Sequence, residues 1–215
     1  MKIHQHIRDL FEEAYKPCSG FTSSCRSMKY LPNQGHVPRG FWGATGSPEQ
    51  VKLILVVAEP GDPHPNEVHS GLDSAYNYAR TSFIAGTDQF HKNVQYILDG
   101  CFPGQTFEQR ETQVWFTESV LCSASTEGGR VPVSVERACG EKFLKKQIEI
   151  FSNATVVALG AKARDRLKKN GFDDFIAATS VAPPGCNSKD AKPSWDKVIE
   201  EVISGQQNTP KPLKQ

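Results

Sequence analysis

Four short apolar runs alternate with helical patterns along this chain, and this alternation restricts the fold more than any other feature. The runs cover residues 52–58, 114–121, 155–159 and 175–181 and are rich in Val, Ile, Phe and Thr, as strands are. Apolar residues at helical spacing predict helices over 4–15, 88–98, 135–151, 161–170 and 194–203. Strands separated by helices favour parallel crossovers, and continuous hydrophobicity indicates a sheet covered on both faces. We therefore predict an α/β fold, a three-layer α/β/α sandwich around a four-stranded, mainly parallel sheet.

The composition is that of an ordinary globular domain, with 38% hydrophobic and 23% charged residues among 215. We expect one domain over residues 1–204, containing an irregular segment over 18–48, and a disordered tail over 205–215. A net charge of +1 gives no global electrostatic case for a polyanionic partner. The apolar runs are too short to cross a bilayer and the N-terminus lacks the pattern of a signal peptide, so we expect a cytoplasmic protein without membrane contact.

An acidic residue, Glu59, follows the first predicted strand and is followed by Pro60 and Gly61. Parallel sheets bind ligands at the carboxyl ends of their strands, so this carboxylate would meet a ligand there. The alternative is a turn acid bonded to nearby backbone amides. We place Phe83 in a loop just before a helix, where it is either a core residue or a platform for a planar ligand.

Four of the six cysteines occur where two parts of the fold could converge. Cys18 and Cys25 lie in the irregular segment, Cys122 closes the second predicted strand, and Cys139 lies in the first turn of the next helix. Four thiolates bind either one iron–sulfur cluster or one zinc ion. The interval between Cys18 and Cys25 is wider than in a usual metal knuckle, and buried cysteines acting as small apolar residues are the other interpretation.

The blocks LILVVAEPG, ARTSFIAGT, VWFTESVLC and ATVVALGAKA, taken in order, resemble the iron–sulfur type of the uracil-DNA glycosylase superfamily, known as family four. The resemblance covers residues 52–170. It implies an enzyme of base excision repair that extrudes uracil or another deaminated or damaged base from DNA and hydrolyses its bond to the sugar. It also implies a four-iron, four-sulfur cluster, in preference to zinc, bound by Cys18, Cys25, Cys122 and Cys139. Such a cluster would hold the irregular segment against the sheet.

The resemblance assigns roles to single residues. Glu59, Pro60 and Gly61 match part of a Gly-Glu-Ala-Pro-Gly motif that here is one residue shorter, and Glu59 would position or activate the attacking water. Phe83 ends a stretch similar to a Gly-Arg-Pro-Phe loop and would stack on the extruded base, with Pro60 and Gly61 as further base-binding residues. The proposal requires the Glu59 carboxyl and the Phe83 ring to face one cavity, and a ring directed into the hydrophobic interior would contradict it.

Two positions depart from the family pattern. Glu118 stands where the family has an Asn that reads the uracil edge, so Glu118 is the residue expected to read the edge of the base. An ionised Glu only accepts hydrogen bonds, so it would repel uracil O4 and would suit a base that presents an amino or imino hydrogen. Pro183 stands where the family has a His that stabilises the leaving base. His64 or His69 could substitute only if the fold brought one of them to the site, the alternative being a solvated loop histidine.

We expect the protein to be a monomer and its partner to be DNA. Two basic residues are predicted to contact the DNA. Lys162 and Arg164 follow Gly160 at a predicted helix start, where backbone amides favour phosphate. Two other functions stay open. One is a non-catalytic member of the superfamily that binds nucleic acid or a partner protein, and the other is an unrelated α/β hydrolase of small molecules with Glu59 as its base.

Overall fold

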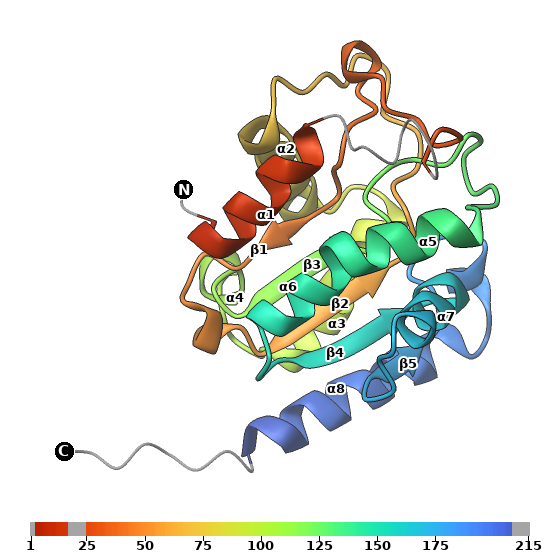
Figure 1. The fold of residues 1–215 in the computed structure, drawn as a ribbon. Helices are drawn as coiled ribbons and strands as arrows, with labels where there is room; N and C mark the ends of the chain where they lie inside the picture. Colours follow the sequence, from red (N-terminus) through yellow and green to blue (C-terminus); the bar gives the residue numbers. More distant parts are fainter. Residues whose placement is uncertain (1–2, 17–24, 208–215) are drawn as a thin grey trace.

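The computed structural model describes residues 3–16 and 25–207, and within them five strands form one mixed sheet (Figure 1). The strands, in the spatial order β1-β3-β2-β4-β5, are Trp42–Gly43 (β1), Leu53–Val57 (β2), Val114–Glu118 (β3), Thr155–Leu159 (β4) and Ile176–Ala178 (β5). β2 to β5 run parallel, whereas β1 is antiparallel to β3. The α/β prediction is confirmed. The predicted strand number is wrong, because β1 lies inside the segment predicted to be irregular.

Helices lie on both faces of the sheet, with α1, α5, α6 and α7 on one side and α3 and α8 on the other (Figure 1). The helices are Gln5–Tyr15 (α1), Leu72–Ala85 (α2), Gln89–Cys101 (α3), Phe107–Arg110 (α4), Val133–Cys139 (α5), Lys145–Ile150 (α6), Ala161–Lys169 (α7) and Ala191–Gln207 (α8). A π-helical turn, Gly140–Leu144, joins α5 to α6. Helix α8 continues to Gln207, so residues 205–207 are helical and not part of a disordered tail, and residues 208–215 lie outside the described part.

Helix α2 occupies a stretch that the sequence analysis treated as a loop. Leu72, Tyr76, Ala79 and Phe83 are buried at helical spacing, so one face of α2 packs on the core. The helix ends at Gly86, whose left-handed backbone (φ 55°) suits a residue without Cβ. Phe83 therefore lies in the last turn of a helix, and its predicted place in a loop before a helix is wrong.

The central strand β2 decides where the site forms. All five of its residues are buried, because β3 and β4 flank it and helices cover both faces. Val57 at its end pairs with Glu118 at the end of β3. The loops that follow the two strands therefore leave the sheet side by side.

The segment after residue 25 is attached to the loop that follows β3. The backbone N–H of Lys29 donates to the carbonyl of Ser123 at 2.9 Å. The Tyr30 hydroxyl donates to the carbonyl of Tyr15 in α1 at 2.6 Å.

Within residues 3–16 and 25–207, none of the helices combines the length and apolar character that a bilayer span requires.

Candidate functional site

A cavity of about 530 Å³ lies at the carboxyl ends of the parallel strands. Its walls come from the loops after β2, β3 and β5, from the ends of β3 and β4, from helices α2, α3 and α7, and from the segment before β1. Glu59, Pro60, Gly61, Glu118 and Lys162 all line it. The fold thus brings the predicted reacting and base-binding residues together where open α/β sheets bind ligands.

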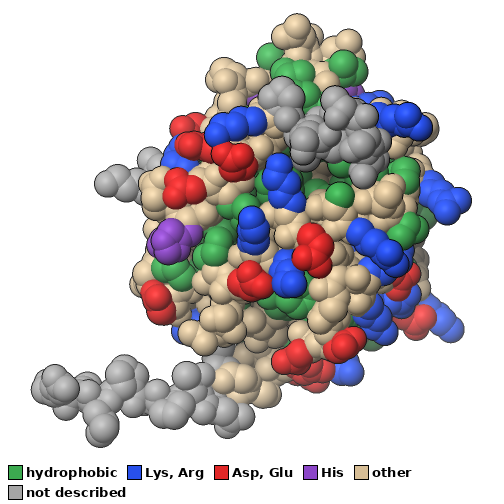
Figure 2. Space-filling view, viewed as in Figure 1, with side chains coloured by type: hydrophobic (Ala, Val, Ile, Leu, Met, Phe, Trp, Pro, Cys, Tyr) green, Lys and Arg blue, Asp and Glu red, His purple; other side chains and the backbone are tan. Residues whose placement is uncertain are grey.

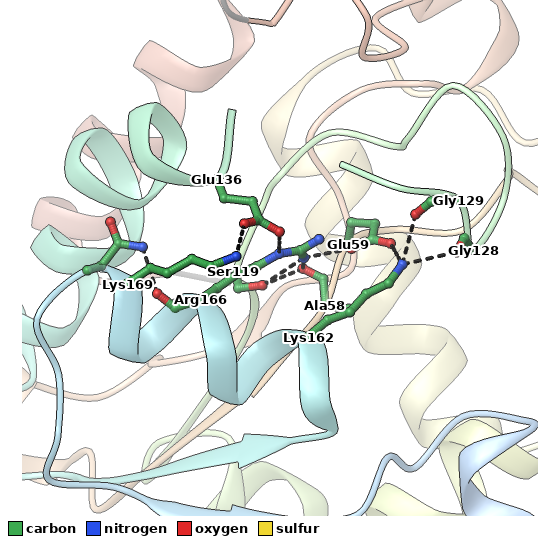
Figure 3. Close-up of polar contacts among 10 residues, drawn as sticks. Ala58, Glu59, Ser119, Gly128, Gly129, Glu136, Lys162, Arg166 and Lys169 are labelled. Carbon is green, nitrogen blue, oxygen red and sulfur yellow. Dashed lines mark hydrogen bonds and ion pairs between the residues drawn. The ribbon is translucent and has the colours of Figure 1, made fainter. Parts of the chain in front are cut away.

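Glu59 reaches this cavity, but two cations bind its carboxylate (Figure 3). Lys162 Nζ donates to Oε1 and also to the carbonyls of Gly128 and Gly129, at 3.1 and 2.9 Å. Arg166 Nη1 lies 2.6 Å from Oε2, out of line for a hydrogen bond, so Oε2 has no hydrogen-bond partner among the described residues. Cations, and not the backbone amides of the turn, therefore hold this side chain, which is only 4% exposed.

Arg166 connects three parts of the fold from the buried face of α7. Its side chain is 1% exposed, and its Nε donates to Glu136 Oε1 in α5 at 3.0 Å. Its Nη1 donates to the Ala58 carbonyl at 2.7 Å and to Ser119 Oγ at 3.1 Å (Figure 3). The guanidinium thus ties α7 to the ends of β2 and β3, next to Glu59.

Arg166 was not among the predicted site residues, because only Lys162 and Arg164 were singled out in this helix. Ala163, Arg166 and Leu167 are the buried residues of this helix. Their spacing of three and four places them on one face, which is the signal that could have found the arginine.

Glu118 is the second acid of the cavity, and its surroundings differ from those of Glu59. The residue is 6% exposed, and its Oε2 has no hydrogen-bond partner among the described residues. Burial raises the pKa of Glu118 well above its usual range; the nearby charge of Glu59 raises it further, and Arg39 and Arg166 only partly oppose this shift. These conditions favour the neutral carboxylic acid over the ionised form considered in the sequence analysis.

Phe83 does not offer a ring face to a ligand. It borders the cavity but is only 2% exposed. Its ring contacts, with centroids 4.6 to 5.9 Å away, are Trp42, Phe90, His91 and Phe116. The ring belongs to the hydrophobic interior, and this contradicts the site as predicted from the sequence, in which the Glu59 carboxyl and the Phe83 ring face one cavity. Phe90, in the first turn of α3, is half-buried and lines the same cavity.

The histidines lie differently from the sequence expectation. His64 is exposed and lines the cavity, whereas His69 is buried with its Nε2 2.7 Å from Glu67 Oε1. The prediction of a solvated loop histidine is therefore wrong for His69. His91, which the sequence analysis did not single out, also lines the cavity, and its Nδ1 lies 2.7 Å from Oδ2 of Asp88, the N-cap of α3. Pro183 lines the cavity as well.

The two predicted DNA contacts are engaged with neighbouring groups. Lys162 is bound to Glu59, and the exposed Arg164 pairs with Asp165 at 2.9 Å. On the face shown in Figure 2, Lys and Arg side chains are scattered among Asp and Glu side chains. Neither residue therefore presents an isolated cation ready for phosphate.

Three of the four predicted metal ligands lie beside one small apolar cluster. Cys25 belongs to this cluster with residues such as Met28 and Val120, and Cys122 and Cys139 pack against it. Cys139 is the last residue of α5, not part of its first turn. Cys18 lies outside the described residues. Among residues 3–16 and 25–207, no three His, Cys, Asp or Glu side chains form a group arranged to hold a metal ion.

No protein-family model matches this chain, and no curated protein sequence matches it.

Proposed function

We propose that this protein is a DNA glycosylase that hydrolyses the bond between a deaminated or damaged base and its sugar. One observation carries the proposal: Glu59 and Glu118 line one cavity, and Glu59 is paired with two cations, whereas Glu118 is buried with its Oε2 unpaired among the described residues. Pairs of acids whose environments differ in this way divide acid and base roles in enzymes. The sequence resemblance to family-four uracil-DNA glycosylases supports the same chemistry.

The reaction forms one bond and breaks another at the C1′ carbon of the sugar. Water adds to C1′, and the bond from C1′ to the base nitrogen breaks with its electron pair passing to that nitrogen. The water divides into a sugar hydroxyl and a proton, which the released base takes up. Glu59 orients the water by accepting a hydrogen bond, and its negative charge favours the electron-poor sugar. Lys162 and Arg166 pair with Glu59 and hold its carboxyl group in position for this role.

Phe90 takes over the stacking role first assigned to Phe83. Stacking of a base on an aromatic ring contributes about 1–3 kcal/mol. We expect Phe90→Leu to weaken binding of a uracil-bearing oligonucleotide about tenfold, whereas Phe83→Leu, which changes a buried ring, should alter the affinity less than about twofold. Dissociation constants measured in a Glu59→Gln background check this. Equal losses in the two variants would contradict it.

The cysteines have the donor chemistry of an iron–sulfur site, and three of them lie beside one apolar cluster. Cys25, Cys122 and Cys139 come from three separate segments and meet at one apolar cluster. With Cys18 they would supply the four thiolates of an iron–sulfur cluster, which we propose in preference to zinc. Bound there, the cluster would cross-link the segment around Cys25 to the loop after β3 and to α5.

Metal content tests this cofactor. Protein purified without oxygen should be brown and contain about four iron atoms per chain. Cys122→Ser should lose most of the iron, whereas Cys186→Ser, which changes a half-buried thiol outside the apolar cluster, should retain it. Colourless protein that contains zinc, or equal iron in both variants, would contradict the iron–sulfur proposal.

A non-catalytic protein of the same fold that binds nucleic acid is the second candidate. Two observations favour it, namely the pairing of Glu59 with two cations and the burial of the Phe83 ring. For either function we propose DNA as the partner, a monomer as the working form, a cytoplasmic location, and the three-layer sandwich of the resembled family.

A panel of oligonucleotides separates the enzyme from the binder. Strands carrying uracil, hypoxanthine or xanthine, single and double, are incubated with the protein and then cleaved with alkali at abasic sites. We expect cleavage of at least one damaged strand and none of the undamaged counterparts. Binding of these strands without release of any base would favour the non-catalytic protein.

A further inference from the structure

Glu118 has the position of a ligand-reading residue. It is the last residue of β3, pairs with Val57 at the end of β2, and lines the cavity. Gly40 leaves room for its carboxyl group, because a Cβ at residue 40 would lie 2.7 Å from Oε1. The positive φ of Gly40, 84°, disfavours any side chain there.

The carboxyl group lacks the partners that a buried polar group normally has. Its Oε2 is buried and has no hydrogen-bond partner among the described residues. Buried polar atoms are almost always paired, so an unpaired one beside a cavity suggests that a ligand completes it. The other cavity acid, Glu59, already has two cations.

The charges around Glu118 decide which hydrogen bonds it makes. Glu59 approaches from the loop after β2, Arg39 from the segment before β1, and Arg166 from α7. Together with burial, they leave the pKa of Glu118 well above its usual range. A neutral carboxyl group carries one O–H donor beside one carbonyl acceptor, whereas a carboxylate has acceptors only.

We infer that Glu118 binds the extruded base as a neutral carboxylic acid, donating its O–H to a ring carbonyl oxygen and accepting a hydrogen bond from the adjacent ring N–H. Uracil, hypoxanthine and xanthine all present such an edge. This inference rests on the proposed function and adds to it the protonation state and the hydrogen bonds with which Glu118 reads the base. It removes the conflict between Glu118 and uracil O4, because that repulsion exists only for the ionised side chain.

Free uracil is the probe for this contact, since its binding needs no excision. We expect wild-type protein to bind uracil at about pH 6. Its affinity for uracil should fall about tenfold as Glu118 ionises at higher pH, because a carboxylate oxygen then faces O4 and both atoms are hydrogen-bond acceptors. Glu118→Gln, whose amide keeps a donor and an acceptor at every pH, should bind without that loss. Glu118→Ala should bind weakly throughout, as should all three proteins with 3-methyluracil, which lacks the N3–H.

Unfolding measurements check the protonation state without a ligand. The folded protein keeps the Glu118 proton at pH values where the unfolded chain has lost it. The free energy of unfolding should therefore fall as pH rises above the ordinary glutamate pKa, until the pH exceeds the raised pKa of the folded state. Glu118→Gln should lack this part of the pH dependence and serves as the folded control for Glu118→Ala.

The outcomes separate this inference from the proposed function. Binding of uracil with the predicted pH profile, but without base release from DNA, would support base binding by Glu118 and contradict the proposed glycosylase activity. Base release together with identical pH profiles for wild type and Glu118→Gln would retain the enzyme and overturn the inference. Affinity for uracil that increases on ionisation of Glu118 would overturn it as well.

Discussion

Replacing Glu59 by glutamine should reduce the rate of base release by at least about a hundredfold, in line with the contribution of a positioned acid–base group. The amide has nearly the shape of the carboxyl group but lacks the charge that orients water and favours the electron-poor sugar. Affinity for the damaged strand should change little, because Glu59 is proposed to act on water and on the sugar, not on the base. Single-turnover release of base and a separate binding titration measure the two effects.

Glu127→Gln is the matched control for the loss of Glu59. Glu127 lines the same cavity, is exposed, and accepts a hydrogen bond from the Asp62 backbone N–H at 3.2 Å. It has no ion pair with Lys162 or Arg166. The same chemical change there should alter the rate less than about twofold. An unchanged rate in Glu59→Gln would remove Glu59 from the mechanism.

Arg166→Ala should lower the free energy of unfolding by about 3–5 kcal/mol, the usual effect of removing one partner of a buried ion pair. The substitution leaves the carboxylates of Glu59 and Glu136, only 4% and 10% exposed, without their shared buried cation. It also removes a donor to the Ala58 carbonyl at the end of β2. Chemical denaturation measures the loss, which is a large part of the stability of a single domain.

The same helix provides the control for this loss. Arg164→Ala removes an exposed guanidinium that pairs only with Asp165, and such pairs contribute about 0–1 kcal/mol. A further variant, Arg166→Met with Glu136→Gln, keeps most of the volume and removes the Glu136 charge, whose remaining partner is Lys169, so it should recover part of the lost stability. Equal effects of Arg164→Ala and Arg166→Ala would contradict the role assigned to the buried arginine.

The strands were predictable where burial on both faces leaves a continuous apolar run. β4 has the predicted bounds, and β2 lies within its predicted range. Strand β1 could not be predicted, because its two residues, Trp42 and Gly43, are too few to show an alternating pattern and form a strand only by pairing with β3. α2 was missed because glycine, serine and threonine in and around it suggested a loop, although its buried residues recur at helical spacing.

The site was predictable in position and only partly in chemistry. Acids at the ends of two neighbouring parallel strands must lie at one edge of the sheet, which is why Glu59 and Glu118 share a cavity. The ionisation of Glu118 depends on burial and on charges from Arg39 and Arg166, which lie far away in the sequence. No local pattern reports such contacts. The burial of Phe83 likewise depends on aromatic rings from other elements.

The protonation of Glu118 at neutral pH tests the central claim most directly, because a neutral Glu118 beside Glu59 is what links the structure to base recognition. Carbon-13 NMR of labelled glutamate carboxyl carbons, with Glu118→Gln to assign the signal, reports this state. We expect a protonated Glu118 in wild type and a lower pKa for Glu118 in Glu59→Gln, since the neighbouring negative charge is then gone. An ionised Glu118 at neutral pH in the wild-type protein would contradict it.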